Sequence, residues 1–419
     1  MAALLIGLLG YWLGRVLPPM PLPAQPAPLA AAEPDTTSLT TKPIENDRAA
    51  SVDTMSATSP QPAPVDESEG CQPQPLRFSS LKVGPVFHRY TGTINQERVT
   101  VELSWTPPDS ITGRFYRWRG GPEYTLGEDE QRREPLVLPV RQGLPDYGGA
   151  GTWRLARVPG AVLRGVWVDT SGHRHPFQLR ENYTGAAQYE IQVLQRSGGK
   201  PATDEENDCR VPYLRQEYLH LLGAAGRHPA LRRLQPPTMA VRRQQLRDNY
   251  EPDSRTRHGV AGRLNDFNLL SYQTSYWADP FGGRPQPGTK SFLVDLVTGD
   301  SLTIASQLRP GYELPLRRLL TAHLLHDYSN TDAEWYWQQD DRPAAEQLVD
   351  LPRPERETLT EEDFLLTGDG LEATYSPFSV YTSPGGMPPA SVLIPYAELR
   401  PLIRPGTPLA RMLAARGIR

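Results

Sequence analysis

The alternation of apolar and polar residues in the middle of the chain predicts antiparallel β-structure. Residues 99–105 carry Val, Val, Leu and Trp at every second position, with Thr, Glu and Ser between them. A period of two is typical of a strand with one buried face. Short apolar runs separated by Gly, Pro and Asp predict further strands at 115–118, 136–140, 153–158, 162–168 and 189–194.

A weak internal repeat lies within this β-rich part. Residues 111–126 and 163–179 each hold an apolar residue, a Gly, aromatic residues, a turn and a run that ends in Leu. Two copies are too few for a solenoid. We therefore expect paired hairpins of one antiparallel sheet.

A different spacing begins after Cys209. Apolar residues between 211 and 222 fall on one helical stripe, which predicts a helix ending near Gly223, and a second helix is predicted at 238–249. The Arg-rich helical segment predicted at 211–262 ends in a charged stretch, since residues 227–263 hold nine Arg against three acidic residues. A solvated helical face is the simpler interpretation, and contact with an anionic glycan or a lipid headgroup is the alternative.

The last part of the chain has a mixed pattern. Strands are expected at 269–276 and 392–395, a helix at 314–325, and a short helix from about residue 397. Two hairpins are expected as well, one around Thr298-Gly299-Asp300 and one around Gly368-Asp369-Gly370.

The first 76 residues predict export. Residues 1–17 are apolar apart from Arg15, a length that fits a signal peptide or a short membrane anchor. Residues 18–76 are rich in Pro, Ala, Ser and Thr, so we expect a disordered tether. Together they indicate a protein held at, or released from, a membrane, on the periplasmic or outer face of the cell envelope.

The net charge and the cysteine content limit which ligands and cofactors we expect. The net charge of −4 over 419 residues gives no general attraction for nucleic acid. The two cysteines, Cys71 and Cys209, could form a disulfide in an oxidising envelope, or remain unpaired thiols. No Cys-x-x-Cys or Cys/His cluster is present, so we expect neither a zinc site nor another cofactor.

Three motifs near the C-terminus resemble a known family. They are Asp295-Leu-Val-Thr-Gly between two strands, Gly370-Leu-Glu-Ala-Thr-Tyr-Ser-Pro-Phe, and Ile394-Pro-Tyr-Ala-Glu-Leu. In this order they resemble the C-terminal domain of unknown function of the lysozyme-sensing anti-sigma factor RsiV, which also accompanies a module of the peptidoglycan deacetylase PdaC. The segment from Tyr90 is similar to β-rich repeats that precede this domain in Bacteroidetes envelope proteins. Where relatives often have Gly-Gly-Ala-His before the Asp-Leu strand, the chain has Phe281-Gly-Gly-Arg-Pro, so the resemblance implies no site that needs that His.

These observations predict an α+β protein in two folded parts. An antiparallel β-rich domain is expected at 77–198, and a mixed domain at 199–419 with helices packed on an antiparallel sheet. The resemblance covers about the second of these parts.

No catalytic motif stands out, so we expect a non-enzymatic module that binds or senses a cell-wall glycan such as peptidoglycan, or an envelope or extracellular protein. A cell-wall hydrolase or deacetylase with an unrecognised site is the alternative. Exposed aromatic and Arg side chains would carry the binding. The candidates are Trp277, Trp335, Tyr336, Trp337, Arg242 and Arg243.

Overall fold

The described residues belong to one compact unit, Asp66–Arg419. The computed structural model of the chain describes residues 73–79, 82–106, 110–127, 136–142, 149–155, 160–203, 209–281, 286–330, 359–375 and 390–418. The apolar segment 1–17, nearly all of the tether, Cys71 and the aromatic run 335–337 lie outside these residues. So does the side chain of Cys209.

Eight antiparallel strands close into a barrel. Each strand pairs with the next along the chain, and β9 pairs back onto β2. The strands are β2 (Lys82–Ile94), β3 (Glu97–Thr106), β4 (Ser110–Arg117), β5 (Tyr124–Leu126), β6 (Leu136–Gln142), β7 (Gly149–Leu155), β8 (Val162–Val168) and β9 (Arg174–Glu181). The strands predicted between residues 99 and 168 are thereby confirmed.

Alternate residues of each strand fill the barrel. Val99, Val101 and Leu103 of β3 join a core that contains Trp153. The polar residues between them, Thr100 and Glu102, are buried too, because the segment that ends at Asp266 lies against the outer face of β3. The period of two therefore marks the barrel side of this strand, but both of its faces are buried.

The internal repeat corresponds to equivalent hairpins of the barrel. Gly113 of β4 lies opposite Leu103, and Gly165 of β8 lies opposite Leu155. A Cβ at either glycine would collide with the neighbouring strand's backbone. Both copies form hairpins of one antiparallel sheet, as predicted.

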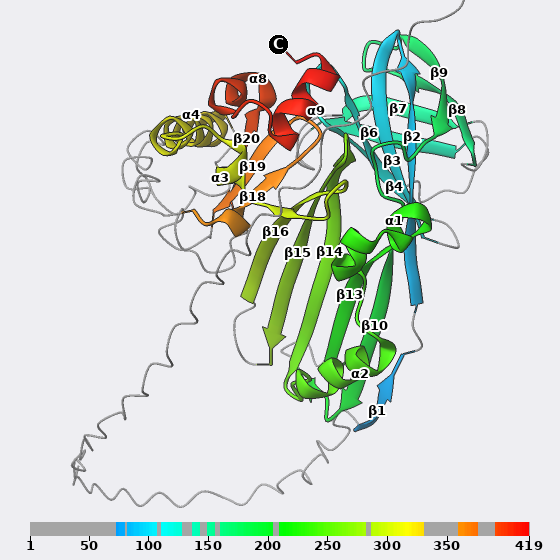
Figure 1. Ribbon diagram of the computed structural model, residues 1–419. Coiled ribbons are helices and arrows are strands. Elements are labelled where there is room, and N and C mark those ends of the chain that lie inside the picture. The colour runs from blue at the N-terminus through cyan, green and yellow to red at the C-terminus, as the bar shows by residue number, and fades with distance from the viewer. Residues whose placement is uncertain are drawn as a thin grey trace, which may run out of the picture. The chain divides into compact units, whose positions relative to one another are not determined.

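A long sheet continues from the barrel through β2. The first half of β2 pairs with β10, and its second half pairs with β9, so one strand serves both sheets. Figure 1 shows the strands of this sheet side by side. They are β1 (Gln74–Phe78), β10 (Tyr189–Gly199), β13 (Tyr213–Leu221), β14 (Ser254–Asp266), β15 (Leu269–Pro280), β16 (Gln286–Asp295) and β17 (Ser301–Leu302); β11 (Ala202–Thr203) and β12 (Cys209–Arg210) form a separate pair.

The helix predicted at 211–222 is wrong, because this segment is strand β13. Leu214 and Tyr218 pack under α2 (Met239–Asp248), while Leu219 packs in a second apolar cluster. In a strand buried on both faces, apolar and polar residues need not alternate. The apolar residues of β13 therefore happen to fall at helical spacing. The Arg-rich segment is only partly helical, since its last residues belong to β14.

Helices connect β13 to β14, which run parallel and therefore need a crossover. The connection contains α1 (Gly223–Arg227), η1 (Pro229–Leu234) and α2. The helix predicted at 238–249 is confirmed as α2, and the Thr238 hydroxyl caps its N-terminus by accepting from Val241 N. Figure 1 shows α1 and α2 on one face of the long sheet.

The C-terminal part has its own core around a three-stranded sheet. Its elements are α3 (Ile304–Gln307), α4 (Glu313–Asn330), η2 (Glu361–Asp363), β18 (Phe364–Leu366), β19 (Gly370–Tyr375), β20 (Ala390–Pro395), α8 (Tyr396–Leu399), η3 (Arg400–Leu402) and α9 (Pro408–Arg416). Both hairpins, the 314–325 helix, the 392–395 strand and the short helix after it are confirmed.

The described residues are mostly β-structure, so the β-rich prediction is confirmed and helices contribute less than expected. The predicted boundary between residues 198 and 199 falls at the end of β10, and the division into two domains stays a prediction. Among the described helices, none is long and apolar enough to cross a membrane.

Gly165→Ala tests the tight packing of the barrel strands. A Cβ there would lie 2.7 Å from Arg154 O and 2.7 Å from the Phe177 ring, so we expect a loss of about 1–3 kcal/mol in the free energy of unfolding. Gly160→Ala is the matched control, since its Cβ would meet nothing within 4 Å. Urea denaturation measures both, and equal stabilities of the two variants would contradict this packing.

Candidate functional site

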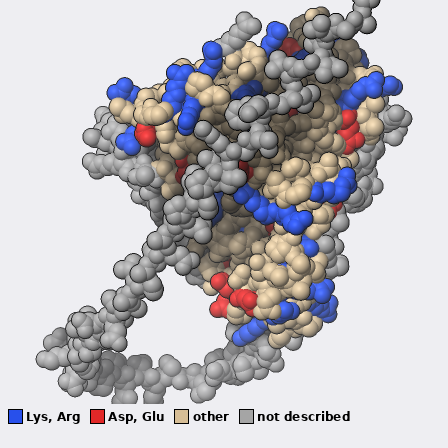
Figure 2. All heavy atoms as spheres, viewed as in Figure 1, with Lys and Arg blue, Asp and Glu red and all other residues tan. Residues whose placement is uncertain are grey.

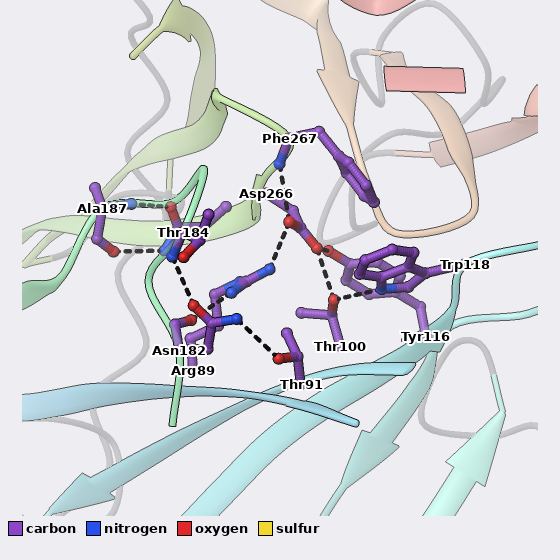
Figure 3. Close-up of polar contacts among 11 residues, drawn as sticks. Arg89, Thr91, Thr100, Tyr116, Trp118, Asn182, Thr184, Ala187, Asp266 and Phe267 are labelled. Atoms are coloured by element: carbon purple, nitrogen blue, oxygen red, sulfur yellow. Dashed lines mark hydrogen bonds and ion pairs between the residues drawn. The ribbon is translucent and has the colours of Figure 1, made fainter. Parts of the chain in front are cut away.

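A buried carboxylate joins the barrel to the β14–β15 hairpin. Asp266, the last residue of β14, pairs with Arg89 of β2 at 2.5 Å, and each side chain is 3% exposed. Thr100 Oγ1 and Tyr116 OH donate to the other carboxylate oxygen, at 2.6 and 3.0 Å, and Phe267 N donates to the first at 2.8 Å. Figure 3 shows these donors converging on Asp266 from different strands. Four donors compensate a charge that burial would otherwise destabilise.

The hairpin turn has an unusual backbone. Phe267 and Asn268 have φ of 53° and 62°, a left-handed conformation that suits Asn but strains a bulky Phe. Asn268 N donates to Gly185 O at 2.7 Å, and the Phe267 ring meets Trp118 edge-on with centroids 5.0 Å apart. Strain of this kind is typical of sites where the surroundings fix a functional geometry.

The loop between β9 and β10 is fixed against the same turn. Asn265 forms a pair of hydrogen bonds with the backbone of Ala187, at 2.7 and 2.8 Å. Asn182 donates to Thr91 Oγ1 at 3.2 Å and accepts from Thr184 N at 2.8 Å. Arg89 donates to Asn182 O as well, so the guanidinium of the ion pair also holds this loop.

A pocket of about 520 Å³ lies between the barrel rim, this loop, the hairpin turn and helix α9. Its lining includes aromatic rings, Arg side chains, hydroxyls and amides. These residues are Arg89, Thr91, Gly92, Thr93, Arg98, Trp118, Asn182, Thr184, Gly185, Asp266, Phe267, Asn268 and Ala415. The volume lies in the range of small-molecule sites.

The Trp118 indole is held in place within this pocket. Its Nε1 donates to Thr100 Oγ1 at 3.0 Å, and the Arg98 guanidinium lies 5.3 Å from the ring centroid. Arg416 of α9 is 2% exposed and donates to Trp118 O at 2.8 Å and to Arg117 O at 2.9 Å. The ring, its hydrogen and its backbone carbonyl are all fixed before any ligand arrives.

The chemistry of the site favours binding over acid–base catalysis. Both oxygens of Asp266 already accept two hydrogen bonds each. Burial, reinforced by the Asp266 charge, raises the pKa of Tyr116 well above its ordinary value, so the phenol remains a donor. These groups form a fixed polar floor rather than a proton-transfer pair.

The binding residues predicted from the sequence do not gather in this pocket. Trp277 is half-buried on β15 and lines a separate groove of about 450 Å³ with Tyr213, Arg257 and Ser275. Arg242 is 8% exposed and donates to Gln192, whereas Arg243 is exposed on α2. Trp335, Tyr336 and Trp337 lie outside the described residues.

Four residues of this pocket were not predicted from the sequence: Arg89, Trp118, Asp266 and Phe267. A signal was present, because Asn265, Asp266 and Asn268 interrupt the apolar residues Leu264 and Leu269, as is typical of a hairpin turn. Nothing local linked that turn to Arg89 or to Trp118.

Several of the described histidines contact a carboxylate. His323 contacts Glu398 at 2.9 Å, and His175 contacts Asp169 at 3.1 Å. Within the described part of the chain, no group of three or more His, Cys, Asp or Glu side chains could hold a metal ion.

Comparison with known proteins finds partial structural similarity. No protein-family model matches the chain, and no curated protein matches it. A DUF3298 family member from Bacteroides fragilis NCTC 9343 is 16% identical with a TM-score of 0.36, over 55% of this chain and 99% of that one. A DUF3298 family protein from Pseudomonas aeruginosa PAO1 is 19% identical with a TM-score of 0.34, over 53% and 94%.

Asp266→Asn tests the buried ion pair. The change leaves the Arg89 guanidinium buried without a countercharge, so we expect a loss of about 3–5 kcal/mol in the free energy of unfolding. Asp300→Asn, at an exposed position of the β16–β17 turn, is the control. A loss below about 1 kcal/mol for Asp266→Asn in urea denaturation would show that the pair is unimportant for stability.

Alkaline pH tests the burial of Tyr116. The folded chain keeps this proton above pH 10.0, where the unfolded chain releases it, so stability is retained below pH 10.0 and lost above it. One such group contributes a slope of up to about 1.4 kcal/mol per pH unit. We expect Tyr116→Phe to reduce the slope of unfolding free energy between pH 10 and 11.5 by about this amount. Tyr276→Phe, which removes an exposed hydroxyl, is the control, and equal slopes for both variants would refute the assignment.

Proposed function

We propose that the chain is a non-enzymatic binding protein of the cell envelope, and that the pocket beside Trp118 receives a sugar unit of a cell-wall glycan. The observation that carries this proposal is the fixed indole of Trp118 in a pocket that also presents hydroxyls and amides. Aromatic rings bind the apolar faces of sugars, while neutral polar groups bind their hydroxyls.

The polar groups around the pocket come from separate elements. Thr91 and Thr93 extend from β2, Asn182 from the β9–β10 loop, and Asn268 from the hairpin turn. Because the ion pair and the loop hydrogen bonds already hold these elements, little conformational entropy is lost on binding. Arg98 is exposed at the rim and adds a donor for a carboxylate or a ring oxygen.

The envelope location rests on the sequence. The apolar segment 1–17 and the tether 18–76 support export, with the folded part anchored or released on the periplasmic or outer side. The motifs that resemble the RsiV and PdaC-associated domain support the same location, and they support an α+β domain at 199–419 after a β-rich domain at 77–198. Peptidoglycan is the first partner to test, and an envelope or extracellular protein the second.

A hydrolase or deacetylase is the alternative function. Glycoside hydrolysis needs two carboxyl groups about 5–10 Å apart, with one free to donate a proton. The carboxylate in this pocket, Asp266, has its oxygens occupied by four donors, which supports binding instead.

Trp118→Ala tests the proposal. We expect this variant of the full-length chain to bind peptidoglycan fragments about tenfold more weakly, because it loses the main stacking surface. Isothermal titration calorimetry with soluble fragments, and sedimentation with insoluble peptidoglycan, measure the change. Asn268→Gly is a second variant that tolerates the left-handed backbone and removes one amide.

Trp277→Ala is the matched control, since this half-buried Trp lies in the separate groove on the long sheet. Weaker binding by Trp277→Ala alone would place the site on that sheet. No binding of any fragment by the unmodified chain would refute the glycan proposal, and capture of an envelope protein would then favour a protein ligand.

A further inference from the structure

A second polar pocket, of about 560 Å³, lies where the crossover helices meet β10 and β13. It shares no lining residue with the pocket beside Trp118. The lining residues are Gln192, His220, Leu221, Leu222, Gly223, Gly226, Arg227, Gln235, Pro236 and Arg242. Cationic and amide side chains therefore come from both strands and from the connection between them.

A hydrogen-bond chain fixes the inner wall of this pocket. Arg242 Nη1 donates to Gln192 Oε1 at 2.9 Å, and Gln192 Nε2 donates to Glu190 Oε1 at 2.9 Å. His220 Nδ1 lies 2.8 Å from the same Glu190 oxygen, and the Arg242 guanidinium stacks 5.2 Å from the Tyr218 ring centroid. His220 Nδ1 also lies 2.8 Å from Gln192 Nε2, so the imidazole is held by both Gln192 and Glu190.

Two buried polar atoms at the pocket have no hydrogen-bond partner among the described residues. They are Arg242 Nε and Gln235 Oε1. Gln235 is oriented, because its Nε2 donates to Leu221 O at 3.1 Å and to Gly226 O at 3.2 Å. Buried polar atoms are normally satisfied, so these two atoms leave unused hydrogen-bonding capacity in the wall of the pocket.

The crossover connection is strongly basic. Residues 223–249 contain six Arg and a single acidic residue, Asp248. Figure 2 shows Lys and Arg side chains gathered over the face where α1 and α2 lie. Arg227 is exposed at the pocket edge, while Arg242 is buried within it. The local field therefore attracts anions to a chain whose net charge is negative.

We propose that this pocket binds the phosphate group of a phosphate-bearing ligand. Two guanidinium groups, an imidazole and an amide approach from different directions, which suits an anion with several acceptor oxygens better than a single carboxylate. The pocket volume leaves room for a further small group on the phosphate, such as glycerol or a sugar. A soluble phosphate ester and a lipid headgroup both present this chemistry.

Calorimetry on the full-length chain tests the proposal with inorganic phosphate, glycerol phosphate and acetate as probes. We expect glycerol phosphate to bind more tightly than acetate, and Arg227→Ala to weaken that binding about tenfold. Arg227 is exposed, so this variant should fold normally. Arg242→Gln should weaken binding at least as much, but it also disturbs a buried hydrogen bond to Gln192.

Arg243→Ala is the matched control, because it removes an adjacent exposed Arg of α2 that does not line the pocket. The proposal predicts less than a twofold change for this variant. Equal weakening by Arg227→Ala and Arg243→Ala would indicate diffuse surface charge and overturn the site. Equal binding of acetate and glycerol phosphate would overturn the phosphate assignment.

Binding to lipid vesicles distinguishes a lipid headgroup from a soluble phosphate ester as the source of the phosphate group. Co-sedimentation with phosphatidylglycerol and phosphatidylcholine vesicles is compared with calorimetry on glycerol phosphate. Arg227-dependent binding to phosphatidylglycerol vesicles would support a lipid headgroup, and binding to glycerol phosphate alone would support a soluble ester. Failure of every phosphate probe to bind would refute the proposal, and neither result depends on the pocket beside Trp118.

Discussion

The buried charge of Asp266 is the constraint on which the junction between the barrel and the rest of the described chain depends. A carboxylate removed from water is costly unless donors surround it, and here the donors come from β2, β3, β4 and the turn itself. None of these elements can move away without exposing an uncompensated charge. The pocket beside Trp118 lies directly on this junction, so the interaction that holds the fold together also fixes the geometry of the proposed binding site.

Arg416 reinforces the junction from the other end of the chain. It donates to the carbonyls of Arg117, Trp118 and Gly368, and its guanidinium lies 5.3 Å from the Tyr116 ring centroid and 5.1 Å from that of Tyr396. A single Arg thereby links the last helix, the barrel rim and the β18–β19 turn. The second proposed pocket has a different composition. It is open and basic, and a chain of side-chain hydrogen bonds on the long sheet forms its inner wall. The two pockets use different chemistry and could bind independently.

Local patterns were enough to predict most strands but not the site. Alternation at residues 99–105 and the Gly-Asp-Gly turn at 368–370 identify strands and a hairpin, because backbone geometry dictates those patterns. The pattern failed at β13, where burial on both faces removes the alternation. The pocket beside Trp118 could not be predicted from local patterns, because Arg89 and Asp266 are 177 residues apart and only the completed fold brings them together. The alternation predicts that Thr100 faces solvent, whereas in the structure it is buried and donates to Asp266.

Strand β2 has a consequence for how the chain keeps its alignment. Its residues alternate between the barrel interior, which receives Tyr90, and the outer face, where Arg89 meets Asp266. A slip of β2 by one residue would place the guanidinium among apolar side chains and expel the tyrosine ring. Because β10 pairs with the same strand, that slip would also misalign the long sheet. The Arg89–Asp266 pair therefore fixes the register of β2, so that this one strand pairs correctly with both β9 and β10.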